Sequence, residues 1–226
     1  ILGERILIEG SVDASGAEGG GSILVGGDYK GGNSNLSNAS ATVLAAGASL
    51  NADAIGAGGG GKVILWADDL TKFHGSISAT GGIVLGDGGF VETSGKNYLE
   101  AYGSVDVSAS QGSGGMWLLD PRDVTITSST SNAGDFGGGE PDTWTPSGAS
   151  SNVLGNTIVS ALGGGTDVTI TTNGAGGENG DITLSTFLAP TMNVEDATLT
   201  FTADGGVDVN SMINASGTNK LNIVIN

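Results

Sequence analysis

The sequence predicts an all-β fold, a parallel β-helix in which short strands stack as successive coils. Three features of the 226-residue chain predict it: an internal repeat, short strands of alternating apolar and polar residues, and 43 glycines that separate those strands. Helical periodicity is nearly absent. Short strands at a regular spacing, without helices between them, are typical of solenoids whose repeats pack against their neighbours.

The repeat is clearest between residues 75 and 127. A strand that follows Gly-Ser is centred on Ile77 and recurs 28 residues later at Val105, while a strand that follows Gly-Gly is centred on Val91 and recurs 26 residues later at Trp117. One coil therefore uses about 27 residues. Upstream copies of the two strands are centred on Leu50 and Val63, and on Val12 and Ile23.

An insertion interrupts the first repeat. The distance from Val12 to Leu50 is 38 residues, longer than the later spacings. Residues 28–38 read DYKGGNSNLSN, a polar composition with glycines that is typical of a surface loop.

Alternation assigns an inward face to each strand, because successive side chains in a strand point to opposite sides of the sheet. The outward positions include Glu92 and His74, which we expect to face solvent. The inward positions should stack in four columns: Ile23, Val63, Val91 and Trp117; Val25, Leu65, Thr93 and Leu119; Val12, Leu50, Ile77 and Val105; and Ala14, Ala52, Ala79 and Val107.

The outward positions after Gly-Gly are unusually apolar. A soluble protein rarely leaves that much apolar surface wet, so we expect a loop or an extra strand to cover this face; the alternative is a partner-binding stripe. The residues concerned are Leu24, Ile64, Trp66, Phe90, Met116 and Leu118, and of these Trp66, Phe90, Met116 and Leu118, together with Phe136 and Trp144, are the candidate contact surface.

The sequence divides into three parts. Residues 1–127 are predicted to form wide coils, residues 128–156 a Gly-, Ser- and Pro-rich excursion with Phe136 and Trp144 as anchors, and residues 157–226 a second, more compact set of coils. The segment NTIVSAL, residues 156–162, is the one stretch that could form a short helix.

Composition restricts the function. Seven basic residues against 24 acidic ones give a formal charge of −17, which disfavours binding to nucleic acid or to an anionic membrane. The absence of cysteine excludes disulfides and thiolate metal sites. We find no membrane-spanning run and no signal peptide, and because the chain begins in mid-pattern we expect a segment of a longer protein.

Several strings resemble the filamentous-haemagglutinin-like exoproteins of two-partner secretion, in particular the high-molecular-weight adhesins. They are GGKVILWADD, FHGSISATGG, GDGGFVETSG, GSVDVSA and GGMWLLDPRDVTIT, with NTIVSAL, GTDVTITT, GGENGDITL and KLNIVIN further on. The resemblance implies a right-handed parallel β-helix in a bacterial surface adhesin. It also implies export to the cell surface through an outer-membrane transporter partner, although the N-terminal secretion domain of such proteins is not found here.

Candidate catalytic groups do not converge in the sequence. His74 is the single histidine and is interpreted as a surface residue, so no catalytic, cofactor-binding or metal-binding residue is predicted. The acidic residues of turns and loops are interpreted as caps of backbone amides rather than as the paired carboxylates of a glycosidase. They are Asp68, Asp69, Asp120, Asp123, Asp135, Glu140 and Asp142.

Weaker patterns receive structural interpretations. GGENGDITL, residues 176–184, occurs once and is interpreted as a turn rather than a calcium site, and the Thr-x-Thr pairs as half-buried strands rather than an ice-binding array. Three Asn-x-Ser sequons, at Asn35, Asn38 and Asn214, are candidate glycosylation sites, since some of the similar adhesins are modified at such asparagines, although chance accounts for them equally well.

We therefore expect a non-enzymatic shaft of a secreted adhesin that supports attachment to glycans, host cells or biofilm matrix. The shaft would project a distal binding region away from the cell. Two alternatives remain open at this point: the stalk of a contact-dependent toxin, and a β-helical polysaccharide lyase or hydrolase.

Overall fold

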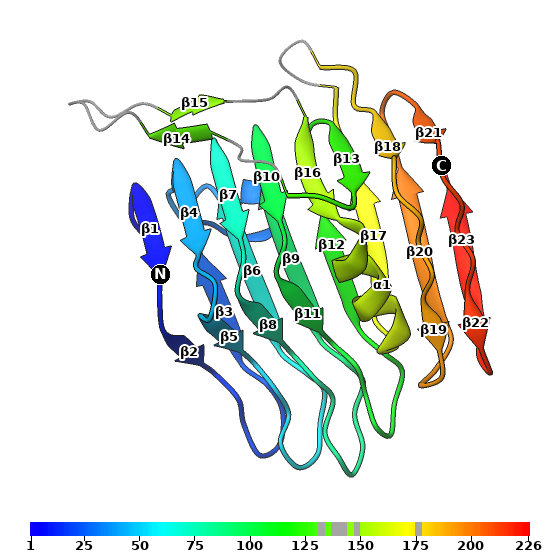
Figure 1. Ribbon diagram of the computed structural model, residues 1–226. Helices are drawn as coiled ribbons and strands as arrows, with labels where there is room; N and C mark the ends of the chain where they lie inside the picture. Colours follow the sequence, from blue (N-terminus) through cyan, green and yellow to red (C-terminus); the bar gives the residue numbers. More distant parts are fainter. Residues whose placement is uncertain (131–133, 137–143, 147–149, 175–177) are drawn as a thin grey trace.

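The computed structural model describes residues 1–130, 150–174 and 178–226, and the backbone of residues 134–136 and 144–146. Parallel strands stack side by side along one axis, with the N-terminal coil at one end and the C-terminal coil at the other (Figure 1). The chain is a parallel β-helix, as its sequence predicts. We name its three long sheets A, B and C.

Each regular coil places one strand in each sheet in turn. Sheet A has the spatial order β1 (Arg5–Ile8), β4 (Ala41–Leu44), β7 (Leu70–Phe73), β10 (Tyr98–Ala101), β16 (Ser151–Leu154), β13 (Val124–Thr127), β18 (Ile182–Leu184) and β21 (Val207–Val209). Sheet B consists of β2 (Ser11–Asp13), β5 (Ser49–Asn51), β8 (Ser76–Ser78) and β11 (Ser104–Asp106). Sheet C runs through β3 (Ser22–Val25), β6 (Lys62–Ala67), β9 (Phe90–Gly95), β12 (Met116–Leu119), β17 (Asp167–Thr171), β20 (Ala197–Thr202) and β23 (Leu221–Ile225).

Smaller elements complete the chain. A parallel pair, β19 (Thr191–Met192) and β22 (Ser216–Gly217), and an antiparallel hairpin, β14 (Gly134–Phe136) and β15 (Trp144–Pro146), lie outside the three long sheets. The helices are the 3-10 turn η1 (Tyr29–Gly31) and α1 (Gly155–Gly163).

The core is one continuous cluster of apolar side chains enclosed by the sheets. The four predicted inward columns are confirmed: their members are buried, apart from Val12 and Ala14 of the first coil, which are partly exposed. Residues paired across the strands belong to the same column, as in Val63↔Val91 and Val91↔Trp117. Trp117 is fully buried, and its indole Nε1 donates a hydrogen bond to Thr93 Oγ1 over 2.9 Å, so the one polar atom of this large side chain has a partner in the core.

The prediction that a loop covers the outer face of sheet C is confirmed over β6, whereas Met116 on β12 stays exposed. Residues 26–40, which include η1, lie against that face, and a Cβ added to Gly31 would lie within 2.6 Å of the indole of Trp66. Ile64 is therefore fully buried and Trp66 is 4% exposed. The loop covers this part of sheet C because the outward side chains of β6 are themselves apolar.

The helix expected near residues 156–162 is α1, which contacts β11, β17 and β19 and takes the place that a sheet B strand has in the earlier coils (Figure 1). It buries Ile158, Ala161 and Leu162, an apolar stripe at helical spacing that could not form one face of a strand. The helix ends at consecutive glycines, of which Gly165 has φ +90.

The excursion returns to the sheet earlier than predicted. Its return strand β16 begins at Ser151 and inserts between β10 and β13, two strands that precede it in the sequence. The later coils continue sheets A and C. Their paired residues, Val168↔Leu199 and Leu199↔Ile223, are 31 and 24 residues apart.

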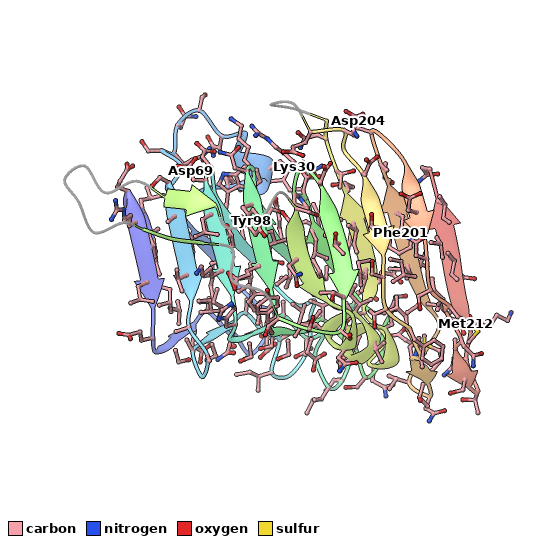
Figure 2. All side chains as sticks on the ribbon, turned by 45° about the horizontal axis from the view of Figure 1, so that its top comes forward. Lys30, Asp69, Tyr98, Phe201, Asp204 and Met212 are labelled. Carbon is pink, nitrogen blue, oxygen red and sulfur yellow. The ribbon has the colours of Figure 1, made fainter. Side chains whose placement is uncertain are left out.

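The outer surface differs along the shaft (Figure 2). On sheet A, Tyr98 is buried and packs with Ala41 and Leu70 in a small cluster outside the main core. Met212, near the C-terminal end of the shaft, is 61% exposed. Within the described residues, neither helix has the length and apolar character needed to cross a bilayer.

Candidate functional site: an axial groove

A groove runs along the shaft where four coils turn into sheet C. It has a volume of about 630 Å³, and a pair of glycines from each coil forms its floor. The pairs precede β3, β6, β9 and β12: Gly20 and Gly21, Gly60 and Gly61, Gly88 and Gly89, and Gly114 and Gly115. We call this feature the axial groove.

Close backbone packing explains the glycines. A Cβ on Gly60 would collide with the carbonyl oxygen of Ala79, and one on Gly88 with that of Val107. Each coil therefore needs glycine at this corner for the next coil to approach. The consequence on the outside is a continuous floor without side chains, and the Gly-Gly pairs before each strand are its signal in the sequence.

The rim of the groove carries side chains of different character. Ser22, Lys62, Phe90, Met116 and Asp167 are the first residues of successive sheet C strands, and all of them line the groove. Parallel pairing places Lys62 beside Phe90 and Met116 beside Asp167. The rim thus changes from basic, through apolar, to acidic along the axis.

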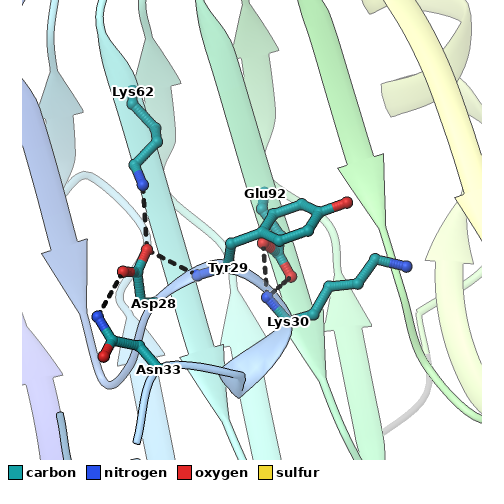
Figure 3. A network of polar contacts seen from close by, with 6 residues as sticks. All are labelled: Asp28, Tyr29, Lys30, Asn33, Lys62 and Glu92. Atoms are coloured by element: carbon teal, nitrogen blue, oxygen red, sulfur yellow. Dashed lines mark hydrogen bonds and ion pairs between the residues drawn. The ribbon is translucent and has the colours of Figure 1, made fainter. Parts of the chain in front are cut away.

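The inserted loop builds one wall beside this rim (Figure 3). The Asp28 carboxylate accepts hydrogen bonds from Lys62 Nζ and Asn33 Nδ2, both over 3.0 Å, and from the Tyr29 amide over 2.8 Å. The bonds from Asn33, Tyr29 and Lys62 lower the pKa of Asp28 to about 2. The loop is thereby held on β6 by an ionised carboxylate.

Tyr29 of the loop packs against Phe90, which lines the groove. Its ring centre lies 5.9 Å from that of Phe90, with the ring planes tilted by 57°. Tyr29 is 50% exposed, so it provides an accessible aromatic surface beside the groove.

Glu92 lies under the loop and corrects a prediction from the sequence. The side chain points outward from β9, as expected, but it is fully buried, because η1 covers it. Its two oxygens accept the Lys30 amide over 3.1 and 3.2 Å. Burial raises the pKa of Glu92 to about 7; hydrogen bonds from Lys30 and Ser94 oppose the shift, and the charge of Asp120 adds to it.

Lys30 connects the loop to the next coil. Its Nζ lies 3.0 Å from Asp120 Oδ2, and Asp120 Oδ1 accepts a 2.6 Å hydrogen bond from Thr171. Lys30 adopts φ 52, the one positive φ of a non-glycine residue in the described part of the chain. This backbone conformation lets its amide face Glu92 while its side chain reaches Asp120.

The predicted contact surface is only partly available. Trp66 and Leu118 are each 4% exposed, so their assignment to a contact surface is wrong: the loop covers Trp66, and Leu118 is enclosed. Phe90 is half-buried and Met116 is exposed, and both line the groove. The side chains of Phe136 and Trp144 lie outside the described residues.

His74 is also less exposed than predicted. Its ring stacks on Tyr102, with centroids 5.1 Å apart and an interplanar angle of 14°, and its Nε2 lies 3.3 Å from Glu100 Oε1. The two rings border a second cavity of about 330 Å³ beside α1, which Asn156 and Ser160 also line. Helix α1 forms part of the cavity wall, at the place where earlier coils have a strand of sheet B.

The carboxylates that were interpreted as caps mostly accept hydrogen bonds within the fold. Asp123 Oδ1 accepts the amides of Gly180 and Asp181. Asp68 and Asp69 instead accept side-chain donors, Asn38 and Asn97 respectively. Asp120 likewise accepts a side-chain donor, the Thr171 hydroxyl, and forms an ion pair with Lys30, so the predicted capping of backbone amides is seen at Asp123.

The remaining candidates are distributed over the surface. Asp135, Glu140, Asp142 and the first two glycines of the segment GGENGDITL fall outside the residues whose side chains the structure describes. Among the described residues no group of three or more acidic or histidine side chains could hold a metal ion. Asn35 and Asn214 are exposed, whereas Asn38 donates its amide hydrogens to Gly31 O and Asp68 Oδ1.

No protein-family model matches the chain, and no curated protein is significantly similar to it. The fold and the groove therefore define its class, a parallel β-helix with an axial groove.

Proposed function

We propose that this chain is a non-enzymatic β-helical segment of a large secreted bacterial surface adhesin, and that its axial groove contacts an extended glycan. The class rests on the resemblance of its repeats to the exoproteins of two-partner secretion. An outer-membrane transporter would export the parent protein, and the segment would act outside the cell.

The observation that carries the glycan contact is the groove itself. A floor of glycine backbone across four coils leaves room for a ligand that runs along the axis, and strands in such a helix are about 4.8 Å apart. Polar groups and aromatic rings border the same floor. Aromatic side chains with a few placed polar groups are what small-molecule sites use for contact and orientation, and the apolar face and hydroxyl groups of a sugar ring fit such a rim.

A glycan array with the immobilised chain tests the proposal. Met116→Trp, which fills the groove from a 41% exposed position, should abolish the signal. Ile83→Trp is the matched control, because Ile83 is 69% exposed and does not line the groove. Equal glycan signals from the two variants, or silence of the unmodified chain, would contradict a groove-based contact.

The enzymatic alternative has its own test. Incubation with acidic polysaccharides would yield new reducing ends or unsaturated products if the chain were a hydrolase or lyase. Clear turnover would overturn the proposal of a non-enzymatic segment. Sequencing of the C-terminal part of the parent protein separates the adhesin from the toxin stalk.

A further inference from the structure

One end of the axial groove is acidic. Asp167 lines this end, and Glu195 borders its floor, since a Cβ on Gly114 would lie 2.8 Å from Glu195 Oε1. Asp87 is close by, because its Oδ1 accepts the Ser113 amide over 2.8 Å. Asp196 follows Glu195 in the chain. We call these four residues, Asp87, Asp167, Glu195 and Asp196, the acidic end.

The fold leaves the negative charge there largely uncompensated. Burial raises the pKa of Glu195, the Gly114 amide opposes this, and the charges of Asp167, Asp196 and Asp87 raise it further. Oε1 of Glu195 is covered and finds no hydrogen-bond donor in the described part of the chain. A cation bound beside these carboxylates would relieve their mutual repulsion.

The basic residue on the rim does not balance this charge. Lys62, the one basic side chain that lines the groove, is neutralised by Asp28 at 3.0 Å. The whole chain carries a formal charge of −17. An anionic ligand would therefore be repelled both by the groove and by the protein as a whole.

The floor disfavours a peptide that adds as a strand. The glycine amides are already used by the coils: Gly60 N donates to Asp87 O, and Gly88 N donates to Ser113 O. Without free backbone donors, a peptide cannot extend a sheet here. A ligand must instead lie flat on the floor and use the rim, where Phe90 and Met116 offer apolar surfaces and Tyr29 adds one beside Phe90.

We propose that the axial groove binds a linear polysaccharide of amino sugars, in which some amino groups are free and protonated. This inference rests on the proposed function, that the groove contacts a glycan. The sugar rings lie along the floor, roughly one to each coil, since the coils repeat every ~4.8 Å. Apolar ring faces and N-acetyl methyl groups contact Tyr29, Phe90 and Met116, and the ammonium groups pair with Asp167 and Glu195.

Titration calorimetry at physiological ionic strength tests the inference with three tetrasaccharides. They are fully deacetylated and fully acetylated oligomers of β-1,4-linked glucosamine, and a uronic acid oligomer. The deacetylated oligomer should bind at least tenfold more tightly than the acetylated one, and the uronate should show no binding. Met116→Trp should remove binding of both glucosamine oligomers.

Charge variants locate the effect. The double variant Asp167→Asn with Glu195→Gln should lose the tenfold preference for the deacetylated oligomer, while weak binding of the acetylated one persists. Asp208→Asn is the control, because this exposed carboxylate lies on β21, outside the groove lining. Thermal unfolding of each variant verifies that it is folded. The substitution Asp167→Asn keeps a side-chain oxygen at the position that accepts the hydrogen bond from the Thr198 amide.

The outcomes separate this inference from the proposed function. If the two glucosamine oligomers bind with equal affinity and Met116→Trp removes the binding of both, the preference for free amino groups is overturned, while the proposal that the groove contacts a glycan is kept. Silence for every glycan overturns both. Tetralysine that binds as tightly as the deacetylated oligomer shows nonspecific attraction of cations, and it also overturns the inference.

Discussion

Two regions of the same β-helix are built differently. From β1 to β12 the chain adds one strand to each sheet per coil, and every new strand pairs with the strand one coil earlier. From β13 to β17 this order fails: β13 lies two positions beyond β10, and β16, which comes later in the chain, lies between them. The first region can therefore grow coil by coil, whereas the second must assemble as a unit.

The difference shows which interactions set the order of a solenoid. In the regular coils the inward columns and the Gly-Gly corners recur, so each coil supplies the surface that the next one needs. Around β13 the pairings span about two coil lengths, because β16 is inserted: Glu100↔Asn152 are 52 residues apart and Val124↔Ile182 are 58 apart. Such non-local pairing is slower to form and more cooperative.

The largest expected effect concerns the inserted strand. Val153→Pro removes a backbone donor from β16, which pairs on both sides, and should cost about 3 kcal/mol or more of folding free energy. Because β13 then loses one neighbour, limited proteolysis with mass spectrometry should find cleavage from β13 onward while β1–β9 stays protected. Val224→Pro, in the last strand β23, is the matched control and should affect only the final coil. If the two variants were equally protected from proteolysis, the region from β13 to β17 would not be a cooperative unit.

In the regular region the sensitive positions are the corners. In Gly88→Ala the new Cβ would collide with the carbonyl of Val107 and the amide of Gly115. We expect a loss of several kcal/mol or no folded protein, measured by urea unfolding, because backbone atoms on both sides cannot yield. Gly10→Ala meets nothing within 4 Å and should change the unfolding free energy by less than about 0.5 kcal/mol. A stable Gly88→Ala protein would show that the corners are adaptable.

Truncation of an inward side chain should strongly destabilise the fold, because the core is closely packed. Trp117→Ala removes a fully buried indole that contacts the ring of Phe73 edge-on at 6.3 Å, and it should cost about 3–5 kcal/mol. The neighbouring Met116→Ala serves for comparison, since that side chain is exposed and should lose about 0.5 kcal/mol or less. Similar urea midpoints for the two variants would show that the inward columns are assigned wrongly.

The smallest effect is pH-dependent and concerns the covering loop. The folded-state pKa of Glu92 is raised from 4.5 to about 7, so its contribution is fully present below pH 4.5 and is lost as pH rises through 7. At 1.36 kcal/mol per pKa unit the loss is about 3 kcal/mol. The unfolding free energy of the unmodified chain, measured between these pH values, should therefore fall relative to that of Glu92→Gln. Parallel pH profiles would mean that Glu92 titrates normally.

Several residues show how far sequence patterns reach. The alternation around Val91 and Trp117 was sufficient to place both in the core, because a period of two leaves only one face for apolar residues. The apolar outward positions were sufficient to predict a cover over sheet C. The same pattern failed for Glu92, since nothing local indicates that η1, about 60 residues earlier in the chain, would lie over this carboxylate.

The groove was only partly visible in the sequence. The Gly-Gly pairs before each sheet C strand mark its floor, and Phe90 and Met116 were already candidate contact residues. The acidic end was not foreseen, because Asp87, Asp167 and Glu195 are far apart in sequence and meet only through stacking. The ion pair between Lys30 and Asp120 was equally hidden, since it joins two different coils.

The sequence by itself determined the repeating part of this protein: the strands, their inward faces, the glycine corners and the short helix. These depend on local periodicity and on backbone sterics, which each short segment carries within itself. The tertiary structure alone decided the insertion of β16 between β10 and β13, the burial of Glu92 and the charge of the groove. Those features depend on which distant segments come into contact, and that is set by the free energy of the whole fold.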